Sequence, residues 1–470
     1  MSESLFRKLP SVDSLLGDPA AAPLLEHFGR EAFLGAARTA LEELRAAIRE
    51  DRPGEVEDEA LGRAGILNRI ESRLMEKIDI GLKRAVNATG ILMHSGLGRA
   101  VVPEAARFAL AQASEGFCTL ALDLETGRRG QRDAAVSRLL AELTGAEAAT
   151  ICNNNAAATV LVLHALARGK EVIVSRGQLV EIGGSFRMPD VMATSGAILR
   201  EVGTTNKTHL RDYAEAIGPE TGAILRVHHS NYRIVGFTSE PEIEELADLG
   251  RKFGVPVIDD IGSGALVDLG VFGLQTEPLV RRSVAAGVAV ACFSGDKLIG
   301  GPQSGLIVGQ ADAVARIKKD PLARAFRCGK LTIAAMEATL KLFLSPDTLT
   351  KTHPLYRMLS IAPDELEKRA RRVERALRKR LPDHIGLAVV DEGSQVGSGS
   401  VPVETIPTKC LAVMPSPSGP GVDALGRALR LHRPAVFTRI KQDAVLFDFR
   451  TIQPGEDRLV EDAVAAILAP

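Results

Sequence analysis

Two hydrophobic patterns alternate through the middle of the chain. Short apolar runs of strand length recur there, separated by amphipathic stretches of helical length such as 241–253. The runs lie at 148–152, 171–175, 223–227, 255–259, 288–293 and 305–309. This alternation is typical of βαβ units and predicts an α/β fold with a mainly parallel sheet covered by helices. Ligands of such sheets bind beyond the carboxyl ends of the strands, so functional residues are expected directly after these runs.

The first eighty residues have a different pattern. Apolar side chains recur at helical spacing within 31–50 and 61–80, and the segment 51–59, which contains a Pro-Gly pair, separates the two stretches. We therefore expect a helical N-terminal module over residues 1–82. Residues 1–84 include 13 basic and 16 acidic side chains, a net charge of −3.

A third part begins near residue 345. Breaks in SPDTLTKTHP (345–354) end the α/β pattern, and the sequence that follows mixes helical and strand-like stretches. We expect a large domain over 83–343 and a small α+β domain over 344–470. Within the small domain, 364–380 is predicted to be a basic amphipathic helix with 8 Lys and Arg against 4 Asp and Glu. Its charged side either is simply solvated or contacts a phosphate backbone.

Composition narrows the class of protein. Apolar residues make up 45% and charged residues 25%, as in globular proteins with a sizeable core. No apolar stretch reaches the roughly 18 residues of a membrane helix, and the N-terminus lacks the apolar region of a secretion signal, so we expect a cytoplasmic protein with no membrane partner. The balance of 58 basic and 59 acidic residues gives no sign of nucleic-acid binding, and no DNA partner is expected. Five cysteines without a C-x-x-C pair argue against a disulfide framework, a zinc ribbon or an iron–sulfur site.

The strongest chemical signal is the segment CFSGDKLIGGPQSGLIVG (292–309). A buried strand is expected to end at Phe293, and Lys297 follows in a polar, glycine-rich turn. A lysine at a strand end can be partly desolvated, which lowers its pKa and makes the amine a nucleophile toward an aldehyde. Pyridoxal phosphate is held in this way, as a Schiff base, although a solvated loop lysine is the simpler alternative. Ser294 and Gln303 in the same segment are expected to contact the cofactor.

A pair of acids ends another predicted strand. Asp259 is the last residue of the run at 255–259 and Asp260 follows it, 37 residues before Lys297. A carboxylate there can pair with the protonated pyridine nitrogen and sustain the electron-withdrawing power of the ring. A turn or a metal site would be the other interpretations. No histidine or third carboxylate stands nearby in the sequence, so no metal is expected.

A third polar turn, Asn153-Asn154-Asn155, lies between the strand at 148–152 and a helix-like apolar stretch. Backbone N–H groups at such a helix start form an anion cradle that would suit the phosphate of the cofactor. We expect Asn153 and Asn154 to bind there, with simple N-capping by asparagine as the alternative. Phosphate turn, acid and lysine all follow strands, and together they favour pyridoxal phosphate more than any one of them alone.

Blocks distributed over nearly the whole chain carry a family resemblance. They are LPSVDSLL (9–16), NATGILMHSGLGRA (87–100), NNNAAA (153–158), the 36 residues from SRGQLVEIGG to NKTHL (175–210), HHSNYRIVGFT (228–238), DIGSG (260–264), SGDKLIGGPQSG (294–305) and PLARAFR (321–327). The chain thereby resembles bacterial selenocysteine synthase, the L-seryl-tRNA(Sec) selenium transferase family. The resemblance implies the type I fold of pyridoxal-phosphate-dependent transferases, as in aspartate aminotransferase.

The resemblance also implies roles for single residues. Lys297 resembles the Schiff-base lysine, and Asp260 resembles the partner of the pyridine nitrogen. Arg99, Arg324 and Arg327 resemble the cluster that holds the phosphate group of selenophosphate. Guanidinium groups suit that role because each offers two parallel hydrogen bonds to phosphate oxygens and keeps its charge.

The implied reaction converts L-seryl-tRNA(Sec) to L-selenocysteinyl-tRNA(Sec). Loss of the β-hydroxyl gives a dehydroalanyl intermediate, selenium from selenophosphate adds to it, and phosphate is released. The family further implies that the N-terminal module binds tRNA(Sec) and that the chain forms a homo-oligomer, a decamer built as a pentamer of dimers. Because the module is acidic here, its RNA contacts would depend on a local patch and on shape.

Two other functions stay open. A related pyridoxal lyase or synthase acting on a small amino acid or sugar acid would not need the N-terminal module. An RNA-binding protein with a degenerate active site would not need Lys297 and Asp260. Ser95-Gly96 and Cys328-Gly329 differ from the usual family pattern, which leaves the substrate contacts at these positions open.

Overall fold

The computed structural model describes residues 5–50, 58–78, 81–183, 186–274, 277–401, 404–415 and 421–469. Most of the expected linker, residues 51–57, lies outside these ranges, as does the end of the helix expected over 61–80. The chain divides into two compact units, Met1–Arg84 and Ala85–Pro470.

The first unit is helical. Its helices are α2 (Val12–Leu16), α3 (Ala22–Phe28), α4 (Arg30–Arg49), α5 (Asp58–Leu61) and α6 (Arg63–Ile78). Apolar stripes of α4 and α6 face each other and bury Phe33, Leu44 and Ile70 completely. Each such side chain stabilises the module by about 1.5–3 kcal/mol, which holds together helices that would be marginal alone.

In the described part of the second unit, seven strands form one sheet in the order β2-β10-β9-β8-β7-β3-β6. They are β2 (Ala148–Cys152), β3 (Glu171–Ser175), β6 (Ile198–Val202), β7 (Thr221–Val227), β8 (Val257–Gly262), β9 (Val290–Ser294) and β10 (Gly305–Gly309). β10 runs antiparallel to both of its neighbours, and the other paired strands are parallel. The prediction of a mainly parallel α/β sheet is confirmed.

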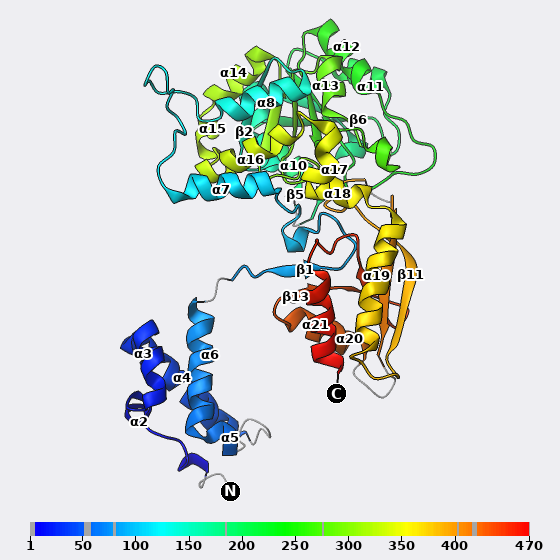
Figure 1. Cartoon of the computed structure of the whole chain (residues 1–470). Coiled ribbons are helices and arrows are strands. Elements are labelled where there is room, and N and C mark those ends of the chain that lie inside the picture. Colours follow the sequence, from blue (N-terminus) through cyan, green and yellow to red (C-terminus); the bar gives the residue numbers. More distant parts are fainter. Residues whose placement is uncertain are drawn as a thin grey trace. The chain divides into compact units, whose positions relative to one another are not determined.

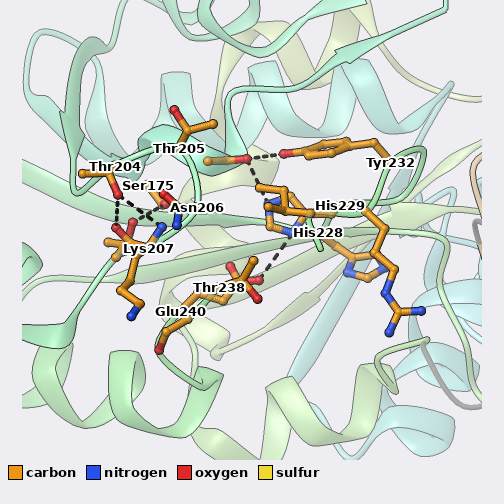
Figure 2. Close-up of a pocket in the computed structure, with 15 residues that line it drawn as sticks. Ser175, Thr204, Thr205, Asn206, Lys207, His228, His229, Tyr232, Thr238 and Glu240 are labelled. Atoms are coloured by element: carbon orange, nitrogen blue, oxygen red, sulfur yellow. Dashed lines mark hydrogen bonds and ion pairs between the residues drawn. The ribbon is translucent and has the colours of Figure 1, made fainter. Parts of the chain in front are cut away.

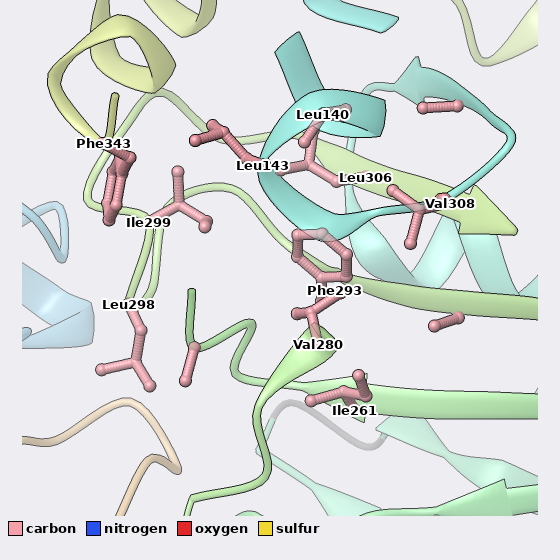
Figure 3. Close-up of a cluster of buried hydrophobic side chains, with 14 of the residues drawn as sticks. Leu140, Leu143, Ile261, Val280, Phe293, Leu298, Ile299, Leu306, Val308 and Phe343 are labelled. Carbon is pink, nitrogen blue, oxygen red and sulfur yellow. The ribbon is translucent and has the colours of Figure 1, made fainter. Parts of the chain in front are cut away.

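Helices cover both faces of this sheet (Figure 1). One face packs against α9 (Asn155–Ala167), α10 (Met188–Ser195) and α14 (Ala311–Lys319). The other packs against α8 (Ala134–Thr144), α12 (Ile243–Phe253), α13 (Val280–Ala286) and α16 (Lys330–Leu342). Phe293 lies in this second core together with Leu140 and Leu306 (Figure 3). β9 is buried along its whole length, which fixes the turn that carries Lys297.

A smaller antiparallel sheet, β11-β12-β15-β14, forms the C-terminal part. Its strands are β11 (Gly386–Ser394), β12 (Ile406–Met414), β14 (Arg439–Lys441) and β15 (Ala444–Asp448), and it packs with α19 (Pro363–Arg378), α20 (Val422–Leu431) and α21 (Asp457–Leu468). The basic helix expected at 364–380 is α19. No helix of the described ranges combines the length and apolarity needed to cross a bilayer.

The hydrophobic cores cross the boundaries expected from sequence. β1 (Ala85–Asn87) pairs in parallel with β13 (Ala435–Phe437), and Val86 lies in the core of the small domain. In the other direction, α17 (Leu349–Thr352) and α18 (Pro354–Ser360) add Leu349 and Tyr356 to the core of the large sheet. The division into ranges 83–343 and 344–470 stays a prediction, because Ala85–Pro470 forms one compact unit in which short segments of each range pack into the core of the other.

Candidate active site

A cavity of about 320 Å³ opens where the carboxyl ends of β7, β8 and β9 meet the start of α9. Its volume falls in the range of small-molecule sites. Of the residues expected in the site, it brings together Arg99, Asn154, Asp260, Ser294, Lys297 and Gln303. The strand-end rule thus locates the cavity from sequence.

Lys297 lies in the wall of this cavity and is only 7% exposed. Burial lowers the pKa of its amine, and the positive charge of Arg99 lowers it further, against the opposing effect of Asp260, Asp296 and Glu277. A lysine of lowered pKa holds a larger share of its amine in the neutral, nucleophilic form.

Two side chains of the α17–α18 region brace the turn that follows Lys297. The hydroxyl of Tyr356 donates to the carbonyl of Leu298 over 3.1 Å, and Nε2 of His353 lies 3.0 Å from the carbonyl oxygen of Ile299. Burial lowers the pKa of His353 to about 4, so the ring is neutral and its Nε2–H donates this bond. The lysine turn is therefore fixed by contacts about 55 residues away in the sequence.

Asp260 and Asp259 have separate environments. Asp260 lines the cavity and accepts hydrogen bonds from Nδ2 of Asn155 and Oγ1 of Thr159, each over 2.8 Å. Burial raises the pKa of Asp260, while these two donors and Lys297 act in the opposite direction. Asp259 is not among the cavity residues and instead binds Arg226 at 3.2 Å and the Ser283 hydroxyl at 2.5 Å.

The start of α9 provides backbone donors. The side chain of Asn154 caps the helix by accepting from the backbone N–H of Ala157 over 2.8 Å. The first-turn N–H groups of Asn155 and Ala156, two cavity residues, have no acceptor within the helix. An anion is favoured at such a helix start. Asn153 is not among the cavity residues, and its backbone N–H donates to Phe326.

These residues fit pyridoxal phosphate. The buried amine, the buried carboxylate and the free backbone donors are the three contacts that its aldehyde, pyridine nitrogen and phosphate require. Oδ1 of Asn155 is buried without a hydrogen-bond partner among the described residues. Gly262 lies in the cavity wall with φ of +71°, a left-handed conformation that favours glycine.

Arg99 lies in the same cavity and is held in a left-handed conformation with φ of 64°. Its Nη1 pairs with Oδ2 of Asp296 at 2.7 Å. Because Asp296 directly precedes Lys297, this pair fixes a guanidinium beside the reactive amine. The prediction that Arg99 belongs to an anion site is consistent with this position.

Arg324 and Arg327 are not among the residues that line this cavity. Arg324 lies in α15 (Pro321–Ala325), and Arg327 follows that helix. The charge of Arg132, followed by those of Arg324 and Arg129, lowers the pKa of Arg327. The structure therefore gathers four guanidinium groups into a separate cationic cluster, two of which were not expected from sequence.

Sequence reasoning missed several residues of the cavity. His228 lies in its wall, and its Nε2 has no hydrogen-bond partner among the described residues, although Oε2 of Glu277 is 3.8 Å away. Asn155 was noticed only as part of the asparagine turn, and Thr159, one helical turn later, was not noticed at all. The spacing of four residues between Asn155 and Thr159, which places both beside Asp260, was the available signal.

A second pocket of about 210 Å³ shares His228 with the lysine cavity. Figure 2 shows its wall, which includes Thr204, Lys207 and Tyr232. The Tyr232 hydroxyl donates to the carbonyl of Gly177. These residues belong to the blocks 175–210 and 228–238, which carry the family resemblance. The residues that resemble the family therefore line this second pocket as well as the lysine cavity.

Comparison with known proteins agrees with this geometry. The family model of L-seryl-tRNA selenium transferase matches residues 85–453, and that of the selenocysteine synthase N terminal region matches residues 6–45. The chain is 45% identical to the L-seryl-tRNA(Sec) selenium transferase of Desulfomicrobium baculatum, over 99% of both sequences. It is 46% identical to that of Geobacter sulfurreducens, over 99% of this chain and 98% of the relative.

A solved structure shares the fold. D-glucosaminate-6-phosphate ammonia-lyase superposes with a TM-score of 0.58 over 84% of this chain and 97% of that chain, at 21% identity. This likeness concerns the fold alone. The family match over most of the length and the identity to full-length relatives decide the assignment: the chain belongs to the L-seryl-tRNA selenium transferase family.

Proposed function

We propose that this protein converts L-seryl-tRNA(Sec) to L-selenocysteinyl-tRNA(Sec), with selenophosphate as the selenium donor. The main support is that Lys297 and Asp260, 7% and 6% exposed, line one cavity together with Arg99. The full-length relatives of this chain are named L-seryl-tRNA(Sec) selenium transferase. The reaction would take place in the cytoplasm, where charged tRNA is available.

Different residues of the cavity would bind different parts of the cofactor. Nζ of Lys297 would bind its aldehyde carbon, Asp260 its pyridine nitrogen, and the start of α9 its phosphate, with Ser294 and Gln303 along the wall. Pyridoxal phosphate, when bound, supplies an electron-withdrawing ring that stabilises negative charge at the α-carbon of the substrate. A pyridinium beside Asp260 would lower the pKa of that carboxyl, because an opposite charge favours the ionised form.

Lys297 also handles the proton. The lowered pKa of the Lys297 amine favours its neutral form. Once the amino group of the substrate has replaced Lys297 at the cofactor, Nζ would accept the α-proton of the seryl group. The carbon–oxygen bond to the β-hydroxyl would then break, and the hydroxyl would leave as water with the proton held at Nζ of Lys297. Selenium would add to the β-carbon while the α-carbon takes up a proton, and water would cleave the selenium–phosphorus bond to give phosphate.

The arginines would bind the phosphate group of selenophosphate. Arg99 lies beside the reactive amine, and Arg324 and Arg327 belong to a cluster whose mutual repulsion an anion would relieve. We propose that Arg99 and the pair Arg324 and Arg327 all contact selenophosphate, although only Arg99 lines the lysine cavity within a single chain.

Substrate tRNA and assembly belong to the same proposal. The match of residues 6–45 to the N-terminal family region supports a role of the helical module in binding tRNA(Sec). A homo-oligomer, expected to be a decamer of five dimers, is supported by large apolar side chains that are exposed in the second unit, among them Phe108, Phe117 and Leu124. Surfaces of this kind are commonly covered by another chain.

The test is incubation of the holoenzyme with seryl-tRNA(Sec) and selenophosphate, followed by analysis of the aminoacyl group. Selenocysteinyl-tRNA is expected from the wild type and none from Lys297→Ala, whereas Lys170→Ala, a change in an exposed lysine, should retain activity. Ammonia release from small amino acids or sugar acids without any tRNA product would instead favour a lyase, the function named for the structurally similar protein.

A further inference from the structure

The exposed side of α19 carries a row of cations. They are Lys368, Arg372 and Arg375 of the helix and Lys379, its C-cap residue with helical backbone angles. They follow each other at intervals of four, three and four residues, and all are exposed. At 3.6 residues per turn this spacing places them on one narrow face, and at 1.5 Å per residue the row extends over about 16 Å. We name these four residues the α19 stripe. It lies opposite the buried side of the helix, Leu366, Ala370, Val373 and Leu377.

Most of the stripe keeps its charge unpaired. Among the described residues, no acid lies within ion-pair distance of Lys368, Arg375 or Lys379, and only Arg372 is paired, with Asp457. Two of the acids of α19 pair with cations outside the stripe: Glu367 with Arg371 at 2.6 Å and Glu374 with Arg378 at 2.9 Å. The two acids of its first turn, Asp364 and Glu365, lie beside Lys368 but outside ion-pair distance of the stripe. A surface helix stabilised by alternating charges would pair these cations too, so the stripe has more positive charge than its own helix needs.

A basic cavity adjoins the stripe at Arg372. Arg372 lines a cavity of about 510 Å³ together with Arg357, Arg369 and Arg450. Arg450 is 1% exposed, and its Nε has no hydrogen-bond partner among the described residues. The two carboxylates in the wall do not balance the four guanidinium groups, and Asp457 is already bound to Arg369. The positive potential therefore extends from the helix into a concave surface.

We propose that the α19 stripe binds the sugar–phosphate backbone of the tRNA substrate, an inference that rests on the proposed function. Unpaired cations in a row of this length suit a polyanion with regularly spaced charges. The acidic N-terminal segment, with a net charge of −3 over residues 1–84, leaves backbone neutralisation to other surfaces. An RNA fits better than an acidic protein, because α19 exposes no large apolar side chain in its described residues, and protein interfaces are built around such anchors.

The experiment compares three full-length holoenzymes: wild type, the stripe variant Lys368→Gln/Arg375→Gln/Lys379→Gln, and a control variant Lys252→Gln/Lys319→Gln/Arg427→Gln. The control removes the same charge from exposed cations on other helices. Affinity for tRNA(Sec) is measured at several salt concentrations, together with the visible absorbance of the bound cofactor and the oligomeric state. The stripe variant should bind more weakly, and the slope of log K against log salt should flatten by about 2 to 3, as expected for the loss of three phosphate contacts.

Each outcome decides between the proposals. A flattened slope in the stripe variant alone, with unchanged cofactor absorbance and assembly, supports the inference. Equal slopes in the stripe variant and the wild type overturn it, and so does a change of oligomeric state with unchanged tRNA affinity, which would assign the stripe to a contact between copies. A wild type that does not bind tRNA(Sec) at all would refute the proposed function itself.

Discussion

Asp259 and Asp260 are neighbours in the chain but face opposite sides of the sheet. The carboxylate of Asp260 borders the lysine cavity, whereas that of Asp259 is completely buried against Arg226 and Ser283 on the other face. Alternation along β8 produces this division, since successive side chains of a strand point to opposite faces. The two residues are therefore a matched pair for separating chemistry from stability.

Asp260→Asn should fold and bind the cofactor but lose about 10²–10³-fold in kcat, because the amide cannot supply the negative charge required at the ring nitrogen. Asp259→Asn should leave the catalytic step of the folded enzyme largely intact and lower the free energy of unfolding by about 1–3 kcal/mol, since it leaves the partly buried Arg226 without its counter-ion and weakens the contact with the buried Ser283. Steady-state kinetics and urea unfolding of both variants test the division. Similar kcat losses in the two variants would contradict it.

Arg99 is expected to set the pH at which Lys297 becomes reactive. Its positive charge lowers the pKa of the Lys297 amine, so Arg99→Ala should raise that pKa. The free amine would then form at higher pH, and the pH profile for uptake of pyridoxal phosphate by the cofactor-free protein should move to higher pH. Arg99→Lys, which retains the charge, serves as the control. A profile that stays in place in Arg99→Ala would refute this coupling.

The arginines outside the cavity should act on the selenium donor alone. Arg324→Ala or Arg327→Ala is expected to raise KM for selenophosphate while the absorbance of the bound cofactor stays unchanged, because neither side chain lines the lysine cavity. Arg316→Ala, a change in a guanidinium that binds backbone carbonyls of α9, is a suitable comparison. Unchanged saturation by selenophosphate would remove the mutated residue from the anion site.

The lowered pKa of buried His353 is expected to make the folded protein less stable in acid. The pKa of the buried ring is about 4 in the folded state and about 6.5 when unfolded, so below pH 6.5 the unfolded chain binds a proton that the folded chain does not. Stability should fall by about 3 kcal/mol as the pH drops from 6.5 to 4. His353→Gln, whose amide can still donate to Ile299, should lack this component. Parallel urea titrations across that range provide the measurement, and identical pH dependence of the two proteins would argue against it.

Sequence patterns predicted the parts of the fold that depend on local periodicity. The runs at 148–152, 171–175 and 305–309 coincide with β2, β3 and β10, and the fold class and family expected from the sequence were confirmed. β6 was missed because it lies at the sheet edge, where Ile198 is 53% exposed and the continuous apolar run of a buried strand is absent.

The site was predictable to the extent that strand ends locate it. Lys297, Asp260 and Asn154 converge as expected because parallel strands end at one edge. The braces Tyr356 and His353 could not be found in this way, since they reach the lysine turn from helices far along the chain and no local pattern relates them to it.

The pairing of β1 with β13 determines when the protein can be completed. Ala85 pairs with Ala435, which is 350 residues later in the chain. During synthesis β1 therefore cannot pair until nearly the whole polypeptide has emerged from the ribosome. Until then Val86 lacks its core and remains accessible to chaperones. A fragment that begins after residue 343 would lack this strand, so separate expression of the C-terminal portion is expected to give an incomplete product.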